Sequence, residues 1–170
     1  MTEYLVVDGY NVMYAWSELD KIKESSMEHA RDKLIDMLVN YAALSGEKVV
    51  IVFDAHRVKS RLERTEVLPG VQVIYTNEGE TADSVIERLA GEYAARGIVY
   101  VVTSDWDEQR VTFGRGAYRM TPGELRGKIK QVSTEGQKPY AGGRPADSYL
   151  EHRLERQLRE ILEHWRRKKR

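Results

Sequence analysis

The sequence predicts an α/β fold in which helices cover both faces of a mostly parallel sheet. Short apolar runs rich in Val and Ile alternate along the chain with longer segments whose apolar residues recur at helical spacing. Such alternation is typical of strand–helix–strand units with right-handed connections, which build three-layer domains. With 170 residues and 41% hydrophobic content, the chain can bury one good core, and we expect a single domain.

The first quarter of the chain supplies a strand and two helices. Residues 4–8 are predicted to form a buried strand, which Gly9 turns into a short helix over residues 12–16. A longer helix is expected over residues 26–44, because its apolar residues recur at helical spacing and Ser26 can serve as its N-cap. These elements form the first crossover of the sheet.

Three further strands and one helix follow. Apolar, β-branched runs predict strands over residues 49–54, 71–75 and 98–103. Residues 81–96 carry apolar positions at helical spacing and are expected to form the helix between the last two of these strands. The polar and basic stretch 55–68 has no regular pattern and is predicted to be a loop or irregular arm.

The pattern is looser in the last third of the chain. Residues 110–113 and 117–120 are short, and we expect a loop or a small peripheral hairpin there. Thr121 begins a capping-box pattern, with proline at the first helical position and glutamate three residues on. Residues 135–145 are rich in Gly and Pro and predict a flexible connector, whereas 146–165 predict a final amphipathic helix.

Four aspartates lie where such a sheet would bring them to one edge. Asp8 and Asp54 end two strands, Asp105 follows a third, and Asp83 lies in the first turn of a predicted helix. Because parallel strands share one carboxyl edge, these side chains should converge there. A hard cation such as Mg²⁺, which prefers oxygen ligands, would relieve their mutual repulsion. The sequence therefore predicts a metal site of the kind found in nucleases.

Each of these polar residues also has a structural interpretation. The helix dipole alone would favour an acid at Asp83, and His56 and Arg57 could pair with Asp54. Asn11 serves equally well as a helix cap or as a residue that holds a water or phosphate at the site. The functional interpretation rests on the whole set, because four such aspartates in register are not expected by chance.

Composition and motifs exclude several other chemistries. The chain has no cysteine, so disulfides, thiolate metal sites and thiol nucleophiles are ruled out. The G-x-x-x-x-G-K-[ST], G-x-G-x-x-G and G-x-S-x-G motifs are missing, and the histidines lack H-E-x-x-H spacing. No apolar run is long enough to span a membrane. We therefore expect a cytoplasmic protein with no membrane partner and no nucleotide cofactor.

The net charge of zero conceals an uneven distribution. Residues 1–109 carry 11 Lys and Arg against 20 Asp and Glu, whereas residues 110–170 carry 16 against 7. One interpretation is an acidic active half followed by a basic half that contacts phosphates. The other is intramolecular neutralisation and solvated helix faces, and charge alone does not separate the two.

Five short motifs follow one another along nearly the whole chain. They are Val-Val-Asp8-Gly-Tyr-Asn11-Val, Phe-Asp54-Ala-His-Arg57, Glu80-Thr-Ala-Asp83, Thr-Ser104-Asp105 and Gly114-Arg-Gly-Ala-Tyr-Arg119. In this order they resemble the YacP-like branch of the NYN domains, which are PIN-like nucleases. The resemblance implies one three-layer PIN-like domain over residues 1–165, including a C-terminal helix, with a basic tail at 166–170.

The resemblance also implies an activity and the residues that perform it. The chain looks like the ribosome-associated endoribonucleases of Firmicutes, which implies metal-dependent cleavage of mRNA in the A-site of translating ribosomes during mRNA decay. Asp8, Asp83 and Asp105 match positions that hold Mg²⁺ or Mn²⁺, supplemented by Asp54 or Asp107, with Asn11 orienting ligands. Contacts with RNA and rRNA are expected from the following residues: His56, Arg57, Lys59, Arg61, Arg64, Trp106, Arg115 and Arg119.

Aromatic residues near the acidic edge are candidates for stacking on unpaired bases. Tyr10, Tyr14, Trp16 and Trp106 lie close to it in the sequence. Core packing is the better interpretation of Tyr14 and Trp16, whereas Trp106 lies between two acids and is the better stacking candidate.

Two functions of other classes remain open. A non-catalytic ribosome- or RNA-binding protein would use the acids only in turns and helix caps. A 5′-nuclease-like enzyme acting on DNA shares the acidic edge. It would normally need more acids and an arch or helical DNA-binding element, for which this chain has little room.

Reversing the charge of Arg57, Lys59 and Arg61 to glutamate should weaken binding of RNA or ribosomes. It should also flatten the salt dependence of binding, because fewer counterions would be released. Binding measured across a salt series, for the wild type and the triple variant, tests this. An unchanged slope would exclude the basic stretch as a phosphate-binding segment.

Overall fold

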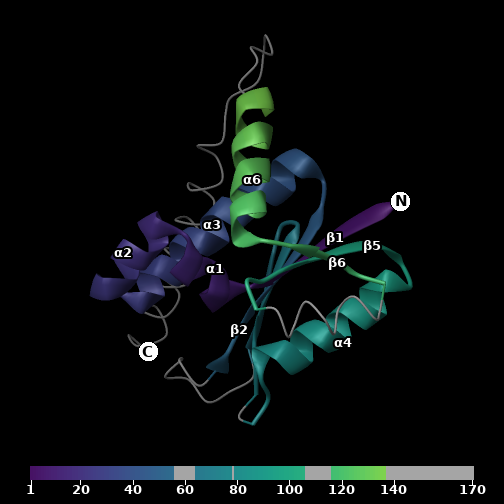
Figure 1. The fold of residues 1–170 in the computed structure, drawn as a ribbon, viewed down its shortest axis with the longest axis horizontal. Coiled ribbons are helices and arrows are strands. Elements are labelled where there is room, and N and C mark those ends of the chain that lie inside the picture. The colour runs from purple at the N-terminus through teal and green to yellow at the C-terminus, as the bar shows by residue number, and fades with distance from the viewer. Residues whose placement is uncertain (56–63, 78, 106–115, 137–170) are drawn as a thin grey trace, which may run out of the picture. The chain divides into compact units, whose positions relative to one another are not determined.

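The fold was analysed in a computed structural model that describes residues 1–55, 64–77, 79–105 and 116–136 (Figure 1). All of these belong to one compact unit, Met1–Gly136. The predicted connector, C-terminal helix and basic tail lie outside the described residues, apart from residues 135–136 of the connector.

The strands are β1 (Thr2–Asp8), β2 (Lys48–Phe53), β3 (Arg64–Leu68), β4 (Val71–Tyr75), β5 (Gly97–Val102) and β6 (Tyr118–Met120). The described helices are α1 (Gly9–Ala15), α2 (Ser17–Ser25), α3 (Met27–Ser45), α4 (Ala82–Ala94) and α6 (Pro122–Gly136).

The six described strands form one sheet in the order β3-β4-β2-β1-β5-β6. Only β3 runs antiparallel to its neighbour, so the predicted α/β class with a mostly parallel sheet is confirmed. The register pairs Asp8 with Val52 on one side of β1, and Val7 with Val102 on the other. The carboxyl ends of β1, β2 and β5 therefore meet at one edge.

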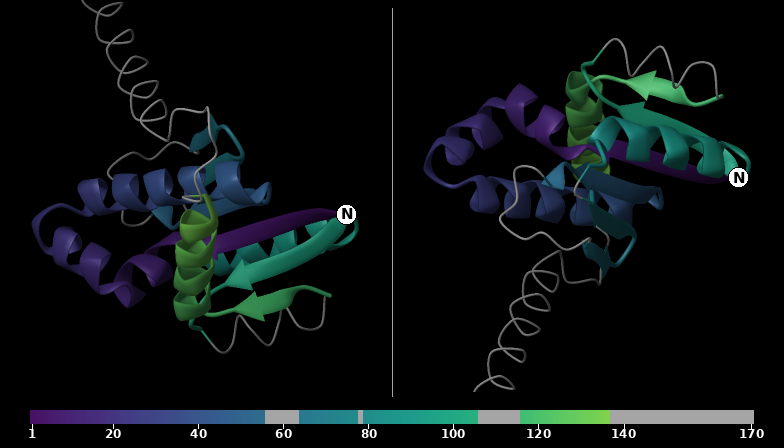
Figure 2. Two further views of the ribbon diagram at one scale, coloured as in Figure 1. Left: turned by 90° about the horizontal axis from the view of Figure 1, so that it is seen from above. Right: turned by 90° about the horizontal axis from the view of Figure 1, so that it is seen from below.

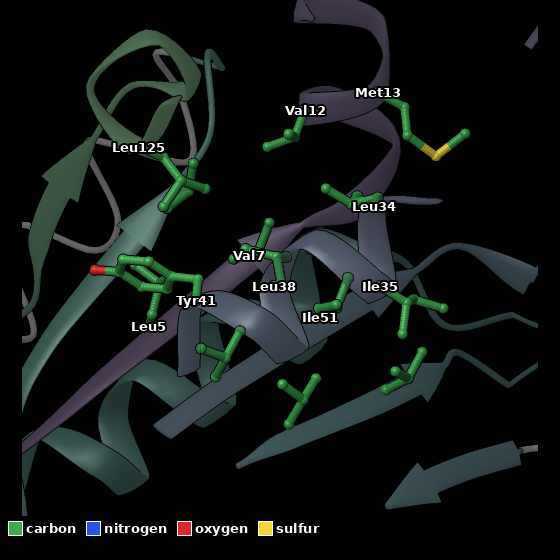
Figure 3. Packing of buried hydrophobic residues seen from close by; sticks show 14 of the residues in the cluster. Leu5, Val7, Val12, Met13, Leu34, Ile35, Leu38, Tyr41, Ile51 and Leu125 are labelled. Carbon is green, nitrogen blue, oxygen red and sulfur yellow. The ribbon is translucent and has the colours of Figure 1, made fainter. Parts of the chain in front are cut away.

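Helices cover both faces of the sheet. Alternate residues of β1 point to opposite sides, as expected for a strand of period two. Leu5 and Val7 pack into a cluster with α1, α2, α3 and α6 (Figure 3), whereas Tyr4 and Val6 pack under α4. Helices α3 and α4 accordingly lie on opposite faces of the sheet (Figure 2). Because both faces are buried, β1 and β5 are apolar along most of their length.

Helix α6 is fixed by polar contacts with both α1 and α3. The indole Nε1 of Trp16 donates to the carbonyl of Pro122 at 2.9 Å. Buried Glu47 accepts from the Tyr41 hydroxyl at 2.7 Å and pairs with Lys128 at 2.9 Å. Burial and the Glu47 carboxylate raise the pKa of Tyr41 to about 12. Although Lys128 lies in the basic half of the sequence, its charge neutralises this buried carboxylate.

The predicted N-terminal caps of α3 and α6 are confirmed. The Ser26 hydroxyl accepts from the backbone N–H of His29 at 3.2 Å, and Gly46 ends α3 with a φ of 76°. Thr121 and Glu124 form the predicted capping box, since each side chain accepts a hydrogen bond from the other's backbone N–H, at 3.1 and 3.2 Å.

Three elements differ from the sequence-based expectations. Residues 64–68, predicted to be part of a loop, form the edge strand β3, whose alternating burial is obscured by charged residues. Strand β6 joins the main sheet by pairing in parallel with β5, whereas residues 110–113, the other part of the expected loop or hairpin, lie outside the described residues. Strand β6 is three residues long, too short to give a periodic signal. Helix α2 was not predicted at all, because its single fully buried residue is Leu19.

Gly9 is required because a buried aromatic ring lies against it. A Cβ at this position would lie 2.3 Å from Cε1 of Phe53. Phe53 is fully buried and packs between Tyr10 and Tyr75, with ring centroids 5.1 and 5.6 Å apart. The sequence suggested a turn glycine here, but its backbone is helical and its φ is not positive. Its role is to allow the start of α1 to approach the end of β2.

Replacing Gly9 with alanine should therefore lower the free energy of unfolding by about 1–3 kcal/mol, the usual cost of overpacking a core. Thermal or denaturant unfolding of the variant measures this. Gly127→Ala is the matched control, because no atom lies within 4 Å of the added Cβ in helix α6. The control should be neutral or stabilised by up to about 1 kcal/mol. Equal stability of Gly9→Ala and the wild type would contradict the proposed packing constraint.

Candidate active site

The candidate site lies at the carboxyl ends of β1 and β5. After β1, the chain builds β2 and β4 on one side of that strand, and α4 then leads to β5 on the other side. The connections leaving β1 and β5 therefore diverge. In open parallel sheets, ligands bind outside the carboxyl ends of the strands at such a switch point.

Asp8 is the last residue of β1 and the N-cap of α1. Its Oδ1 accepts a hydrogen bond from the backbone N–H of Asn11 at 3.3 Å. The pKa of Asp8 is raised to about 6, chiefly by burial and additionally by the charges of Asp83, Asp105 and Asp54, against the lowering effect of the Asn11 hydrogen bond. Among the described acids of the site, Asp8 thus has the most strongly raised pKa. A nearby cation would stabilise its ionised form.

Asp83 approaches the same edge from the opposite layer. It lies in the first turn of α4, where the Thr81 hydroxyl caps the helix by accepting from the N–H of Ser84 at 3.2 Å. Although Asp83 is exposed, desolvation followed by the charges of Asp105 and Asp54 raises its pKa. The structure therefore places the four aspartates within one another's electrostatic reach, as the strand pattern predicted.

Two buried threonines position the loops that carry the other two acids. The Thr76 hydroxyl accepts from the N–H of Ala55 at 2.9 Å, which fixes the residue after Asp54. The Thr103 hydroxyl accepts from the N–H of Asp105 at 3.0 Å. Sequence reasoning did not assign these supporting roles. The available signal was a threonine directly after each of two apolar strands, in Val-Ile-Tyr-Thr76 and Tyr-Val-Val-Thr103.

Asn11 connects the two strands that flank the switch point. Its side-chain Oδ1 accepts from the backbone N–H of Ser104 at 2.7 Å and from the Ser104 hydroxyl at 2.9 Å. The helix cap is supplied by Asp8, so the capping interpretation of the Asn11 side chain is wrong. Through Asn11 and Ser104, the first turn of α1 is tied to the loop that carries Asp105.

The donors at this edge suit a hard divalent cation better than zinc. The four acids offer carboxylate oxygens, and no cysteine exists to bind zinc through sulfur. Among the described residues, no three His, Cys, Asp or Glu side chains are gathered around one point that could hold a metal. Mg²⁺ commonly keeps several waters and uses one or two carboxylates together with substrate phosphates. Carboxylates that act partly through water need not gather around one point.

The residues predicted to bind RNA are only partly described. Arg64 and Arg119 are exposed on β3 and β6, the two outer strands of the sheet. Arg64 lies 3.9 Å from a carboxylate oxygen of Glu66 and 5.6 Å from the centre of the Tyr75 ring. The other residues predicted to bind RNA lie outside the described part of the chain: His56, Arg57, Lys59, Arg61, Trp106 and Arg115. Asp107, predicted to support the metal, lies outside it as well.

Two of the three described aromatic residues near the edge, Tyr10 and Tyr14, have environments that differ from those expected. Tyr10 is buried against Phe53, and its hydroxyl accepts from Arg31 at 3.2 Å, so its ring is not exposed for stacking on a base. Trp16 is buried, as expected. Tyr14 was expected in the core but is 44% exposed, with Nζ of Lys23 at 3.8 Å from its ring centre.

In the part of the chain that the structure describes, no helix has the length and apolar character needed to cross a membrane.

Comparison with known proteins identifies the family. Residues 5–167 match the YacP-like NYN domain. The chain is 40% identical over 162 residues to the uncharacterized protein YacP of Bacillus subtilis, covering 94% of this chain and 83% of that protein. The crystal structure of Rae1 (YacP) from Bacillus subtilis superposes with a TM-score of 0.67 at 36% identity, covering 96% of this chain and 94% of the other. A mutant of the same protein gives a TM-score of 0.65 at 35% identity, covering 95% and 85%. Together with the confirmed fold, these matches show that the chain belongs to the YacP-like NYN domain family.

Proposed function

We propose that the protein is a metal-dependent endoribonuclease that cleaves mRNA on translating ribosomes, in the A-site, as part of mRNA decay. The observation that carries the proposal is the convergence of Asp8, Asp54, Asp83 and Asp105 at the switch point of the sheet, where burial, followed by the charges of the other three acids, raises the pKa of Asp8 to about 6. Perturbed acids grouped at such an edge are typical of catalytic sites. Membership of the NYN family supports a nuclease.

Each acid has a distinct part in this proposal. Asp8, together with Asp83 and Asp105, would hold Mg²⁺ or Mn²⁺, with Asp54 or Asp107 in support. The bound metal would activate a water molecule and stabilise negative charge on the scissile phosphate. Asp8 would release its proton on binding the cation, because a positive charge favours the ionised carboxylate. The two buried threonines would keep the loops of Asp54 and Asp105 in place during the reaction.

Single-stranded RNA is the substrate class that fits best. The carboxylate edge would repel a phosphate chain unless cations and basic side chains offset its charge. The basic stretch that follows Asp54 in the sequence would supply such side chains, as would the exposed Arg64 on β3 and Arg119 on β6. The proposed partners are therefore mRNA and, through the same basic residues, the rRNA of the ribosome. The ribosomal setting rests on the resemblance to ribosome-associated nucleases.

Replacing Asp8 with asparagine should abolish cleavage without unfolding the protein. Asparagine is as good an N-cap as aspartate, and it removes the charge that the metal requires. We expect at least about a 100-fold loss of cleavage of a reporter mRNA translated by purified ribosomes with Mg²⁺ or Mn²⁺. Asp20→Asn is the control, because Asp20 pairs with Lys23 on α2, on the outside of the helical layer. It should cleave like the wild type.

The same experiment separates the proposal from its alternatives. If naked RNA is cleaved as fast as mRNA on translating ribosomes, the protein is a nuclease whose mechanism does not require the ribosome. Cleavage of DNA in preference to RNA would favour a 5′-nuclease-like enzyme. If neither the wild type nor Asp8→Asn cleaves, while both bind ribosomes, the protein is a non-catalytic binding module.

A further inference from the structure

We propose that the side-chain amide of Asn11 donates a hydrogen bond to a phosphate oxygen of the RNA strand and is not an oxygen ligand of the metal. Ser104 is the positioning residue that holds the amide in this orientation. The inference rests on the proposed function, since it names the group that contacts the RNA at the same site. It assigns Ser104 a role that does not require contact with RNA or metal.

The orientation of the amide follows from its contact with a backbone group. A side-chain amide has an oxygen that only accepts and a nitrogen that only donates, and the two are easily exchanged in assignment. The backbone N–H of Ser104 can only donate, and it lies 2.7 Å from the Asn11 side chain. The atom that faces it must therefore be the oxygen. The Ser104 hydroxyl, at 2.9 Å, is a second donor to the same oxygen.

The oxygen of Asn11 is thus already engaged by two donors. A carbonyl-type oxygen has two lone pairs, so the two bonds from Ser104 fill its accepting capacity. Binding a metal through this oxygen would require at least one of these hydrogen bonds to be broken. The connection between α1 and the loop of Asp105 would be weakened as a result.

The side-chain nitrogen of Asn11, unlike its oxygen, makes no hydrogen bond to the described residues. In the described residues, no acceptor faces the two N–H donors of this half-buried amide. The neighbouring Asp8 carboxylate is bonded instead by the backbone N–H of Asn11. A donor group with no acceptor among the described residues, beside acids that attract cations, is suited to a ligand oxygen with negative charge. In this site that ligand is the phosphate of the strand to be cleaved.

The first arm of the test measures cleavage kinetics and metal dependence. Asn11→Asp keeps an oxygen for Ser104 but removes the donors, and Asn11→Ala removes both groups. If the amide donates to phosphate, both variants should lose about 100-fold in kcat, the usual effect of losing one donor to developing charge. The metal concentration for half-maximal activity of Asn11→Ala should stay within about twofold of the wild type. An Asn11→Asp variant that stays active, or needs less metal, would show a ligand role and overturn the inference.

Ser104 is tested by a pair of variants of equal shape. Ser104→Val removes the hydroxyl but keeps the backbone donor, so we expect a loss in kcat of about 5-fold, the effect of one hydrogen bond. Ser104→Thr keeps the hydroxyl and should restore the wild-type rate. Equal rates for the two variants would exclude Ser104 as a positioning residue.

A second arm does not depend on cleavage. In NMR spectra of ¹⁵N-labelled full-length protein in EDTA, the Asn11 side-chain amide signals are identified by their loss in Asn11→Asp. They should shift when a short single-stranded RNA is added, and the shift should be smaller in Ser104→Val. If signals of the surrounding edge move and those of Asn11 do not, the donor role is wrong. If the wild type neither binds RNA at this edge nor cleaves it, the proposed function fails and the inference fails with it.

Discussion

The crowding of negative charge at one edge of the sheet is the constraint on which the rest of this structure depends. Asp8 has its pKa raised from 3.8 to about 6, first by burial and then by the other three acids. An acid whose pKa is higher in the folded than in the unfolded state disfavours folding once it is ionised. This cost therefore grows as the pH rises from about 4 to 6, and at neutral pH it reaches about 3 kcal/mol at most. Bound cations would remove most of it.

The surrounding fold offsets this cost with contacts that hold the edge in place. Parallel pairing fixes β1 between β2 and β5, so the ends of these strands have little freedom to separate. Phe53 packs against Gly9 below the edge, and Thr76 and Thr103 hold the loops beyond it. The Asn11–Ser104 hydrogen bond joins the start of α1, which follows β1, to the loop that follows β5. A site supported in this way can keep carboxylates close together that would otherwise move apart.

The sequence allowed the central strands and the four acids to be predicted because their signals are local. A run such as Leu-Val-Val before Asp8 combines strand propensity, burial and a polar end in a few residues. The contact between Asn11 and Ser104 joins residues 93 positions apart, and no local pattern encodes it. Strand β6 has three residues, and it forms only because β5 offers a free edge beside it. Tyr10 and Tyr14 were misplaced for a related reason, since which side of a short helix faces the core depends on the helices packed against it.

The most direct test of whether this acidic edge binds a cation is to measure the pKa of Asp8 in the folded protein, with and without Mg²⁺. It can be followed by the ¹³C chemical shift of its carboxyl carbon during a pH titration, with Asp8→Asn providing the assignment. Without metal the carboxyl should titrate near pH 6. With Mg²⁺ its pKa should fall well below that value, because the cation favours the ionised form. A pKa near 4 in the metal-free protein, or a pKa of about 6 that Mg²⁺ does not change, would contradict an acidic edge built to hold a cation.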